Sequence, residues 1–498
     1  MREILYLQLG DYSNHVGTHF WNMQDEYRSL DMNEQDDVDT TISFTERYNL
    51  DGSYTLYPRV IIFDQRENFG TLAQSNALGA TSEIQPSPGL WNHSIDEVRQ
   101  NQITKSTYHM QMEEEDPSDP PHMAGATNVQ NIRYWSDYSH VYYLPRSIQR
   151  VPNVLHWENP GEDWKQSQNQ FHRYNEDNDL MDTSIRLFLE ESDNIQGIQL
   201  TNDVSNFGGF SAALLTKMTD EFMKTPVLAF PILSTNMTDY KDDKRSTRQI
   251  LNEAFHLRCL KEMASLSLPF RSPQLWPEHA WMQLDALRTS YYSSSLISAH
   301  VENVTFPLRT RSSLDNIDAF GAHLTDAEGL PSFAEISGVI PVQDRTNFGH
   351  NLVNYSTFAP GGVLYSIRDI IRGFDPSDRQ KYDKWLGEGV SGIKLKTMQA
   401  PGQPLTAPVR SLLPKATDLV KSYSRASTSS NLARMFKEYA SFLDRSLRRR
   451  TASIMSADID IDEIRELVND LWVIHDQYPV EEENNDLGDE IIDDDEES

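Results

Sequence analysis

The first 27 residues combine two hydrophobic patterns. Residues 3–9 carry mostly apolar side chains on both faces of an extended chain, which is typical of a strand buried in a parallel sheet. Gly10 ends this strand, and Ser13 or Asn14 is in place to cap a helix after it. Apolar positions then recur at helical spacing, at Val16, Phe20, Met23 and Tyr27. The pattern predicts a strand, a turn and a helix, as at the start of a doubly wound α/β fold.

Later segments repeat this alternation. A strand over 58–64 ends in the carboxylate of Asp64. A second strand over 195–201 is followed by a glycine-containing turn, a helix over 211–223 and a buried strand over 227–233. We therefore expect a doubly wound parallel sheet within residues 1–265, with helices on both faces.

The sequence pattern changes in the later part of the chain. Further helices are predicted over 248–264 and 277–300. Residues from about 301 to 400 mix short strands with Gly/Pro turns, and a proline-rich stretch at 399–414 suits an irregular connection or edge strand. This pattern predicts a smaller α+β domain over 266–415. Residues 416–479 are predicted to be a helical segment, whose clearest amphipathic helix begins at Asn431.

Three polar stretches interrupt these elements. Residues 29–50 and 105–128 are predicted to be loop insertions. Residues 480–498 contain 11 acidic and no basic residues, which predicts a disordered acidic tail. A dense basic sequence, Arg445 to Thr451, suits either a solvated helix end or a contact for acidic lipid headgroups, with Thr451 and Ser453 as candidate phosphorylation sites.

Composition narrows the function classes. The 498 residues include 44 Lys and Arg against 75 Asp and Glu, a net charge of −31, so we expect no direct nucleic-acid binding. The single cysteine, Cys259, excludes a disulfide framework and fits a reducing compartment as a packed core thiol. The sequence contains no run of about 18 apolar residues, so we expect no transmembrane segment. The N-terminus does not resemble a targeting peptide.

Five segments in chain order resemble tubulins. They are Met1–Ile4 with Gln8, Gly10, Asn14, Gly17 and Phe20-Trp21; Tyr57–Val60 with Asp64; Gln196–Thr201; Asn252–Ala254 with Cys259; and Ser295–Ala299 with Pro307–Arg309. Trp135–Tyr138, Pro145–Ser147, the length and the acidic insertions are more similar to the Misato family, especially its fungal members, than to tubulin itself. The resemblance implies a tubulin-like α/β domain over residues 1–265.

The resemblance also implies a relic nucleotide site. Matched to the tubulin motifs, its residues would be Gly10, Asn14, Gly208, Gly209, Ser211 and Asn252. GTP would be the ligand of such a site, but the phosphate loop is reduced to two glycines between Phe207 and Phe210. We therefore expect no bound cofactor and no metal, with Gly208 and Gly209 forming a strand-to-helix turn, and Asn14 and Asn252 acting as helix N-caps or, for Asn252, a surface amide.

Other tubulin positions are also altered. Arg66 replaces a carboxylate that can face magnesium, and Ser294 replaces a second guanine-contacting asparagine. Asp318 has the spacing of the catalytic acid that tubulins donate to a neighbouring subunit, but an exposed helix-start carboxylate is favoured for Asp315 and Asp318. His256 is expected to be structural. We expect no catalytic residue.

By resemblance, we expect a non-catalytic scaffold in mitochondrial partitioning and mitochondrial DNA inheritance. It would lie on the cytoplasmic face of mitochondria or in the cytoplasm and bind protein partners at the organelle surface. A polymerising GTPase is one alternative. The other is a cytoskeletal assembly factor whose partners are tubulin or a cytosolic chaperonin.

Overall fold

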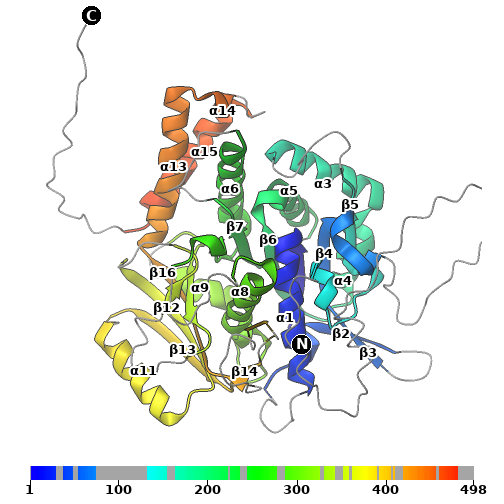
Figure 1. The fold of residues 1–498 in the computed structure, drawn as a ribbon, viewed down its shortest axis with the longest axis vertical. Coiled ribbons are helices and arrows are strands. Elements are labelled where there is room, and N and C mark those ends of the chain that lie inside the picture. Colours follow the sequence, from blue (N-terminus) through cyan, green and yellow to red (C-terminus); the bar gives the residue numbers. More distant parts are fainter. Residues whose placement is uncertain are drawn as a thin grey trace, which may run out of the picture.

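The fold is built from two β-sheets with helices between and around them (Figure 1). The computed structural model describes residues 2–29, 37–48, 54–73, 132–153, 163–222, 225–235, 244–277, 287–325, 330–342, 352–357, 362–389, 392–404, 406, 408–409, 419–455 and 459–479. The predicted insertion over 105–128 and the predicted acidic tail over 480–498 lie outside these residues.

The first sheet is parallel throughout, with strand order β5-β4-β1-β6-β7-β8 and with β9 also paired to β7. Its strands are β1 (Glu3–Leu9), β4 (Val60–Gln65), β5 (Ile148–Val151), β6 (Ile195–Asp203), β7 (Val227–Leu233), β8 (Leu266–Ser267) and β9 (Phe270–Arg271). Leu5 and Leu7 pack on one face while Ile4 and Tyr6 pack on the other, which confirms the strand predicted with two apolar faces.

Helices cover both faces of this sheet. One hydrophobic core includes residues of α3 (Trp164–Asn178), α5 (Val204–Glu221), α6 (Lys244–Met263), α13 (Asn431–Arg449) and α15 (Ile461–Asp476). The other includes residues of α1 (Asp11–Ser29), α8 (Ser290–Thr305) and α9 (Ile317–Thr325). The doubly wound α/β architecture predicted from the sequence is therefore present.

The second sheet has the strand order β11-β10-β16-β12-β13. Its strands are β10 (Glu335–Val339), β11 (Val353–Asn354), β12 (Leu364–Arg372), β13 (Lys394–Ala400) and β16 (Ser422–Ser429), and α11 (Pro376–Gly389) connects β12 to β13. The observed divisions differ from the predicted ones at both ends. Residues 422–429, expected in the helical segment, form the central strand β16, and residues 266–271 pair with the first sheet.

Shorter elements complete the described chain. Part of the region predicted as a loop over 29–50 is β2 (Phe44–Tyr48), which pairs antiparallel with β3 (Tyr54–Pro58), so the loop prediction is wrong there. A short antiparallel pair, β14 (Gln403–Pro404) and β15 (Leu419–Val420), lies in the proline-rich connection. The remaining short helices are Thr40–Ile42, Arg66–Ala73, Trp135–Tyr138, Pro145–Ser147, Met181–Ile185, α4 (Arg186–Glu190), Pro273–Leu275, Phe306–Arg309 and α14 (Ala452–Met455).

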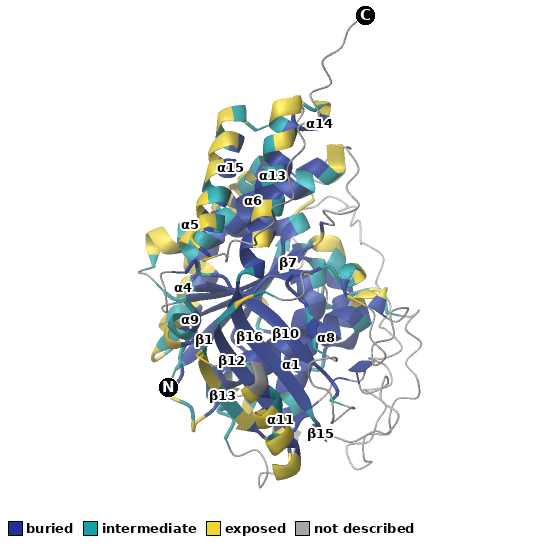
Figure 2. Cartoon of the chain, turned by 90° about the vertical axis from the view of Figure 1, so that its left-hand side faces the viewer, coloured by how far each residue is buried: buried dark blue, intermediate teal, exposed yellow. Residues whose placement is uncertain are grey.

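Burial separates the inner elements from the outer ones (Figure 2). Helices α1 and α8 are almost wholly buried, whereas α11 and α15 expose one side to solvent. The amphipathic helix predicted from Asn431 is confirmed as α13, which packs against α15. Within the described ranges, no helix has the length and apolar character needed to cross a membrane.

The buried helix α8 is joined to α1, to β14 and to β12 of the second sheet by the carboxylate of Glu302, whose side chain has no solvent exposure. Glu302 accepts hydrogen bonds from Tyr27 Oη on α1 at 2.6 Å and from Gln403 Nε2 on β14 at 2.7 Å. It also forms ion pairs of 3.2 Å with Arg372 of β12 and with Arg309, which follows α8. Donors from four other segments therefore converge on one side chain.

Glu302→Gln should strongly destabilise the protein, because it leaves two arginines buried without a counter-charge. Loss of one partner from such a site typically costs about 3–5 kcal/mol. We expect a clear drop in the guanidinium midpoint of unfolding. Asp462→Asn, which breaks an exposed pair with Arg465, is the matched control and should change stability by less than about 1 kcal/mol. Equal shifts for the two variants would contradict this role of Glu302.

Candidate functional site

The predicted site begins at the turn between β1 and α1. Gly10 has a φ of +95°, a conformation that favours glycine, and its N–H donates to Phe63 O at 3.0 Å. A Cβ at this position would lie 2.8 Å from Cβ of Asp203. The turn is therefore pressed against the end of β6, where the tubulin resemblance places nucleotide phosphates.

Asn14 has a different role from the predicted N-cap. Helix α1 begins at Asp11, and the buried Asn14 amide donates to Phe63 O at 3.1 Å and to Asp64 Oδ2 at 2.8 Å. The N-cap prediction is therefore wrong, because Asn14 connects α1 to the end of β4.

Asp64, the carboxylate predicted at a strand end, is buried at the centre of this connection. It also accepts hydrogen bonds from Trp135 Nε1 at 3.0 Å and from Asn68 Nδ2 at 2.8 Å. Burial, with a smaller contribution from the neighbouring Asp11 carboxylate, raises the pKa of Asp64 to about 7. These hydrogen bonds link β4 to α1 and to the two short helices that contain Asn68 and Trp135.

The junction between β6 and α5 contains no glycine loop. Helix α5 begins at Val204, directly after Asp203, whose carboxylate caps it by accepting from Ser205 N at 3.2 Å and Ser205 Oγ at 2.6 Å. Burial raises the pKa of Asp203 above its ordinary value. The ring of Phe207 is buried, and its Cδ2 would lie 3.1 Å from a Cβ at Gly10. Side chains therefore close the space between the two turns.

Gly208, Gly209 and Ser211 all lie inside α5, so the predicted strand-to-helix turn at the two glycines is wrong. Their backbone N–H groups belong to a helix and not to a loop that could surround phosphates. Gly209 instead permits close helix packing: a Cβ there would lie 2.4 Å from the carbonyl oxygen of Trp164 on α3. The physical reason for Gly209 is therefore the contact between α3 and α5.

The last of the predicted site residues, Asn252, lies in α6. It is buried near the middle of this helix, which excludes both the N-cap and the surface-amide predictions. The adjacent Glu253 is also buried and accepts from Ser234 N at 2.6 Å and Thr235 N at 3.0 Å. The hydroxyl of Tyr439 on α13 donates to the other oxygen of Glu253 at 2.5 Å. Glu253 thus fixes the loop after β7 against two helices.

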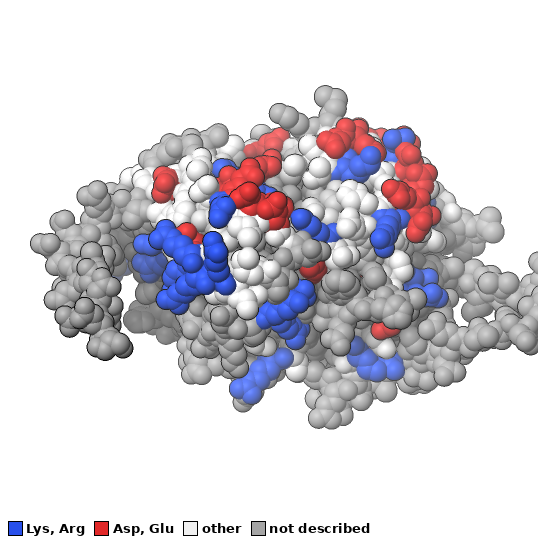
Figure 3. Space-filling model, turned by 90° about the horizontal axis from the view of Figure 1, so that it is seen from above, with Lys and Arg blue, Asp and Glu red and all other residues white. Residues whose placement is uncertain are grey.

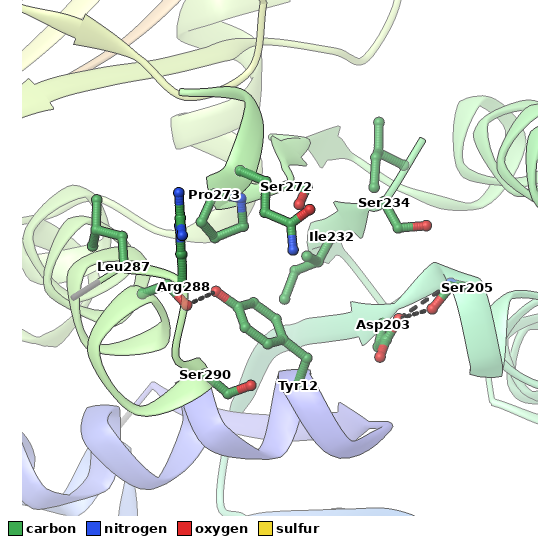
Figure 4. Close-up of a pocket in the computed structure, with 13 residues that line it drawn as sticks. Tyr12, Asp203, Ser205, Ile232, Ser234, Ser272, Pro273, Leu287, Arg288 and Ser290 are labelled. Carbon is green, nitrogen blue, oxygen red and sulfur yellow. Dashed lines mark hydrogen bonds between the residues drawn. The ribbon is translucent and has the colours of Figure 1, made fainter. Parts of the chain in front are cut away.

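A cavity of about 200 Å³ remains beside these elements (Figure 4). In Figure 4, Tyr12 projects from α1 between Arg288 on one side and Asp203 with Ser205 on the other. The Tyr12 hydroxyl donates to Ser293 Oγ at 2.8 Å, linking α1 to α8. Of the six predicted site residues, none lines this cavity; its lining includes Tyr12, Asp203, Ser205, Ile232, Ser234, Pro273, Arg288, Ser290 and Ser293.

None of this lining was predicted from the sequence. Tyr12 lies two positions after Gly10 and Asp203 five positions before Gly208, whereas the contributions of Ser234, Arg288 and Ser290 had no signal in the local pattern. Glu253 was visible only as part of the Asn252–Ala254 segment, and its contacts come from residues far away in the chain.

The structure agrees with the prediction for Asp318 and contradicts it for Asp315. Asp318 is exposed in the first turn of α9, as predicted. Asp315 is buried, contrary to prediction: burial acts to raise its pKa, but Lys396 at 2.6 Å and Arg368 at 2.5 Å outweigh burial and hold the pKa below its usual range. Asp315 therefore joins the segment just before α9 to the second sheet.

The two remaining candidates are structural. Burial raises the pKa of the Cys259 thiol to about 12, which suits an unreactive packed side chain. His256 is buried with Nε2 3.2 Å from Asn202 Nδ2, and burial lowers its pKa to about 4. Across the described residues, no group of three or more His, Cys, Asp or Glu side chains is placed to hold a metal ion.

A parallel first sheet, a buried central helix and a second sheet, with the tubulin-type segments in register, define a tubulin-related protein. Comparison with known proteins agrees: a model of the Misato segment II tubulin-like domain matches residues 2–114, and a tubulin domain model matches residues 124–310.

Relatives identify the family within this class. The chain is 31% identical to protein dml1 of Aspergillus clavatus over 355 residues, covering 70% of this chain and 68% of the relative. It is 32% identical to protein dml1 of Aspergillus niger, covering 69% and 68%, and 31% identical to protein dml-1 of Neurospora crassa, covering 78% and 74%. The chain belongs to the Misato family.

Gly209→Ala should destabilise the protein, because the added methyl group would be forced against the backbone of α3. Overpacking of this kind typically costs about 1–3 kcal/mol, and we expect a lower denaturant midpoint. Gly387→Ala is the matched control, because a Cβ at that helical position on α11 meets nothing within 4 Å. Its stability should stay unchanged or rise by up to about 1 kcal/mol. A tolerated Gly209→Ala would show that α3 and α5 are not in close contact.

Proposed function

We propose that this Misato-family chain is a non-catalytic, tubulin-related scaffold that acts in mitochondrial partitioning and mitochondrial DNA inheritance. Its site of action would be the cytoplasmic face of the organelle, where it binds protein partners. The observation that carries the non-catalytic part is the closed junction at Gly10, Asp203 and Phe207. The mitochondrial part comes from the family to which the chain belongs.

The shape of the closed junction argues against a nucleoside triphosphate. Phosphate-binding loops work because glycines let backbone N–H groups approach oxygen atoms. Here the helix starts immediately after the strand, and Asp203 already uses its carboxylate to cap it. A carboxylate beside the phosphates would also repel them at short range.

The neighbouring cavity supports the same conclusion. Its volume of about 200 Å³ lies below the ~300–1,000 Å³ usual for small-molecule sites. Tyr12 occupies part of the space between α1 and α8, and its hydrogen bond to Ser293 holds it there. A guanine nucleotide would have to displace this side chain as well as the contact between Gly10 and Asp203.

A nucleotide assay tests the non-catalytic part. Heat-denatured, purified protein should release no guanine nucleotide, and titration with GTP and Mg²⁺ up to the millimolar range should show no saturable binding, because side chains fill the phosphate space. Tubulin carried through the same procedure is the positive control. Stoichiometric GTP or GDP, or magnesium-dependent turnover, would overturn the proposal in favour of a polymerising GTPase.

Cell fractionation tests the mitochondrial part. The tagged full chain should co-sediment with mitochondria and be released by carbonate or protease treatment of intact organelles, and its depletion should lower mitochondrial DNA copy number. Detection of bound nucleotide would not change the fractionation result, so the non-catalytic role and the mitochondrial role are tested separately. Recovery with tubulin or a cytosolic chaperonin, and none with mitochondria, would favour an assembly factor and contradict this part of the proposal.

A further inference from the structure

Four arginines, Arg445, Arg448, Arg449 and Arg450, are exposed at the C-terminal end of α13; we refer to them as the arginine surface. Figure 3, which looks down on this end of the molecule, shows a dense group of basic side chains on the side where α13 ends. Arg448 pairs with Asp444 at 2.8 Å, a contact open to solvent. The surface is thus strongly basic on a chain whose net charge is −31.

The chain returns to the same helix after α15. The ring of Tyr478 stacks on Phe436, in the second turn of α13, with the ring centroids 6.4 Å apart. The Tyr365 hydroxyl on β12 donates to the carbonyl oxygen of Pro479, the last described residue. The acidic segment 480–498 therefore leaves the folded body beside the early turns of α13.

The distance from this point to the arginine surface is short. Arg445 and Arg450 follow Phe436 by 9 and 14 residues, or about 14 and 21 Å along the helix axis at ~1.5 Å per residue. An extended chain covers ~3.3–3.6 Å per residue, so about six or seven residues after Pro479 suffice to reach Arg450. Residues 486–497 carry eight of the eleven acidic residues of the segment and lie within reach of all four arginines.

We propose that the acidic segment 480–498 docks on the arginine surface of its own chain. The contact is made by the acidic residues from Asp486 onward, whereas Glu481, Glu482 and Glu483 lie too close to Pro479 to cover the whole surface. Each exposed ion pair is weak, but several act together, and the shared chain keeps the local concentration of the segment in the ~millimolar range. Salt weakens such a contact between exposed charges.

Distances between two spin labels test the docking directly in the full chain. Cys259→Ala removes the single cysteine, and Ala452→Cys beside Arg450 and Ser498→Cys provide the labelling sites. At low salt we expect a narrow population of short distances. At ~1 M salt, where screening reduces the Debye length to ~3 Å, that population should fall at least threefold.

Charge-matched variants determine which groups are responsible. Replacing Asp493, Asp494 and Asp495 with Asn should reduce the short-distance population at least threefold, whereas replacing Glu481, Glu482 and Glu483 with Gln should leave it within about twofold. On the basic side, Arg448→Gln with Arg449→Gln should abolish it, and Lys381→Gln with Lys384→Gln, on the exposed face of α11, should not. Unchanged unfolding midpoints would show that the variants are folded. Persistence of the short distances after loss of the two arginines, or equal effects of the two acidic triplets, would overturn the proposal.

Discussion

A fully buried carboxylate needs hydrogen-bond donors around it, and Glu302 meets this requirement by joining α8 to α1, to β14 and to the second sheet. Moving an ion out of water costs several kcal/mol unless partners replace the lost hydration. Tyr27, Gln403 and Arg372 supply those partners from segments far apart in the chain, and Arg309 supplies one from the turn that follows α8. Because loss of either arginine would remove a counter-charge from the buried carboxylate, these contacts hold α8 in its position between the sheets. The surrounding elements depend on this arrangement.

At the candidate nucleotide site, the parallel strands end at one edge, where doubly wound folds bind ligands, and side chains close the gap there. Gly10 lies against Asp203, and Gly209 allows α3 to approach α5. These glycines serve packing between protein segments.

The sequence predicted elements whose pattern is local. Strands with two apolar faces and the amphipathic α13 were found because burial leaves a periodic signal. The start of α5 was missed, since two adjacent glycines have low helix propensity, and the close approach of α3 that explains Gly209 is visible only in the fold. The serine-rich β16 was missed too, because its buried polar side chains pair with His300 and Asn303 of α8. Asn14 was singled out from the sequence, but its contacts with Phe63 and Asp64 depend on the fold.

The strand order also has a consequence for how the molecule is made. β1 lies between β4 and β6, and β6 begins at Ile195, 192 positions after Glu3. At synthesis rates of ~5–20 residues per second, β1 waits about 10–40 s for that neighbour. Gln403, which completes the setting of Glu302, emerges later still. The central strand is therefore among the first segments to leave the ribosome, and one of its edges, with its apolar side chains, stays unpaired until 192 further residues have been made.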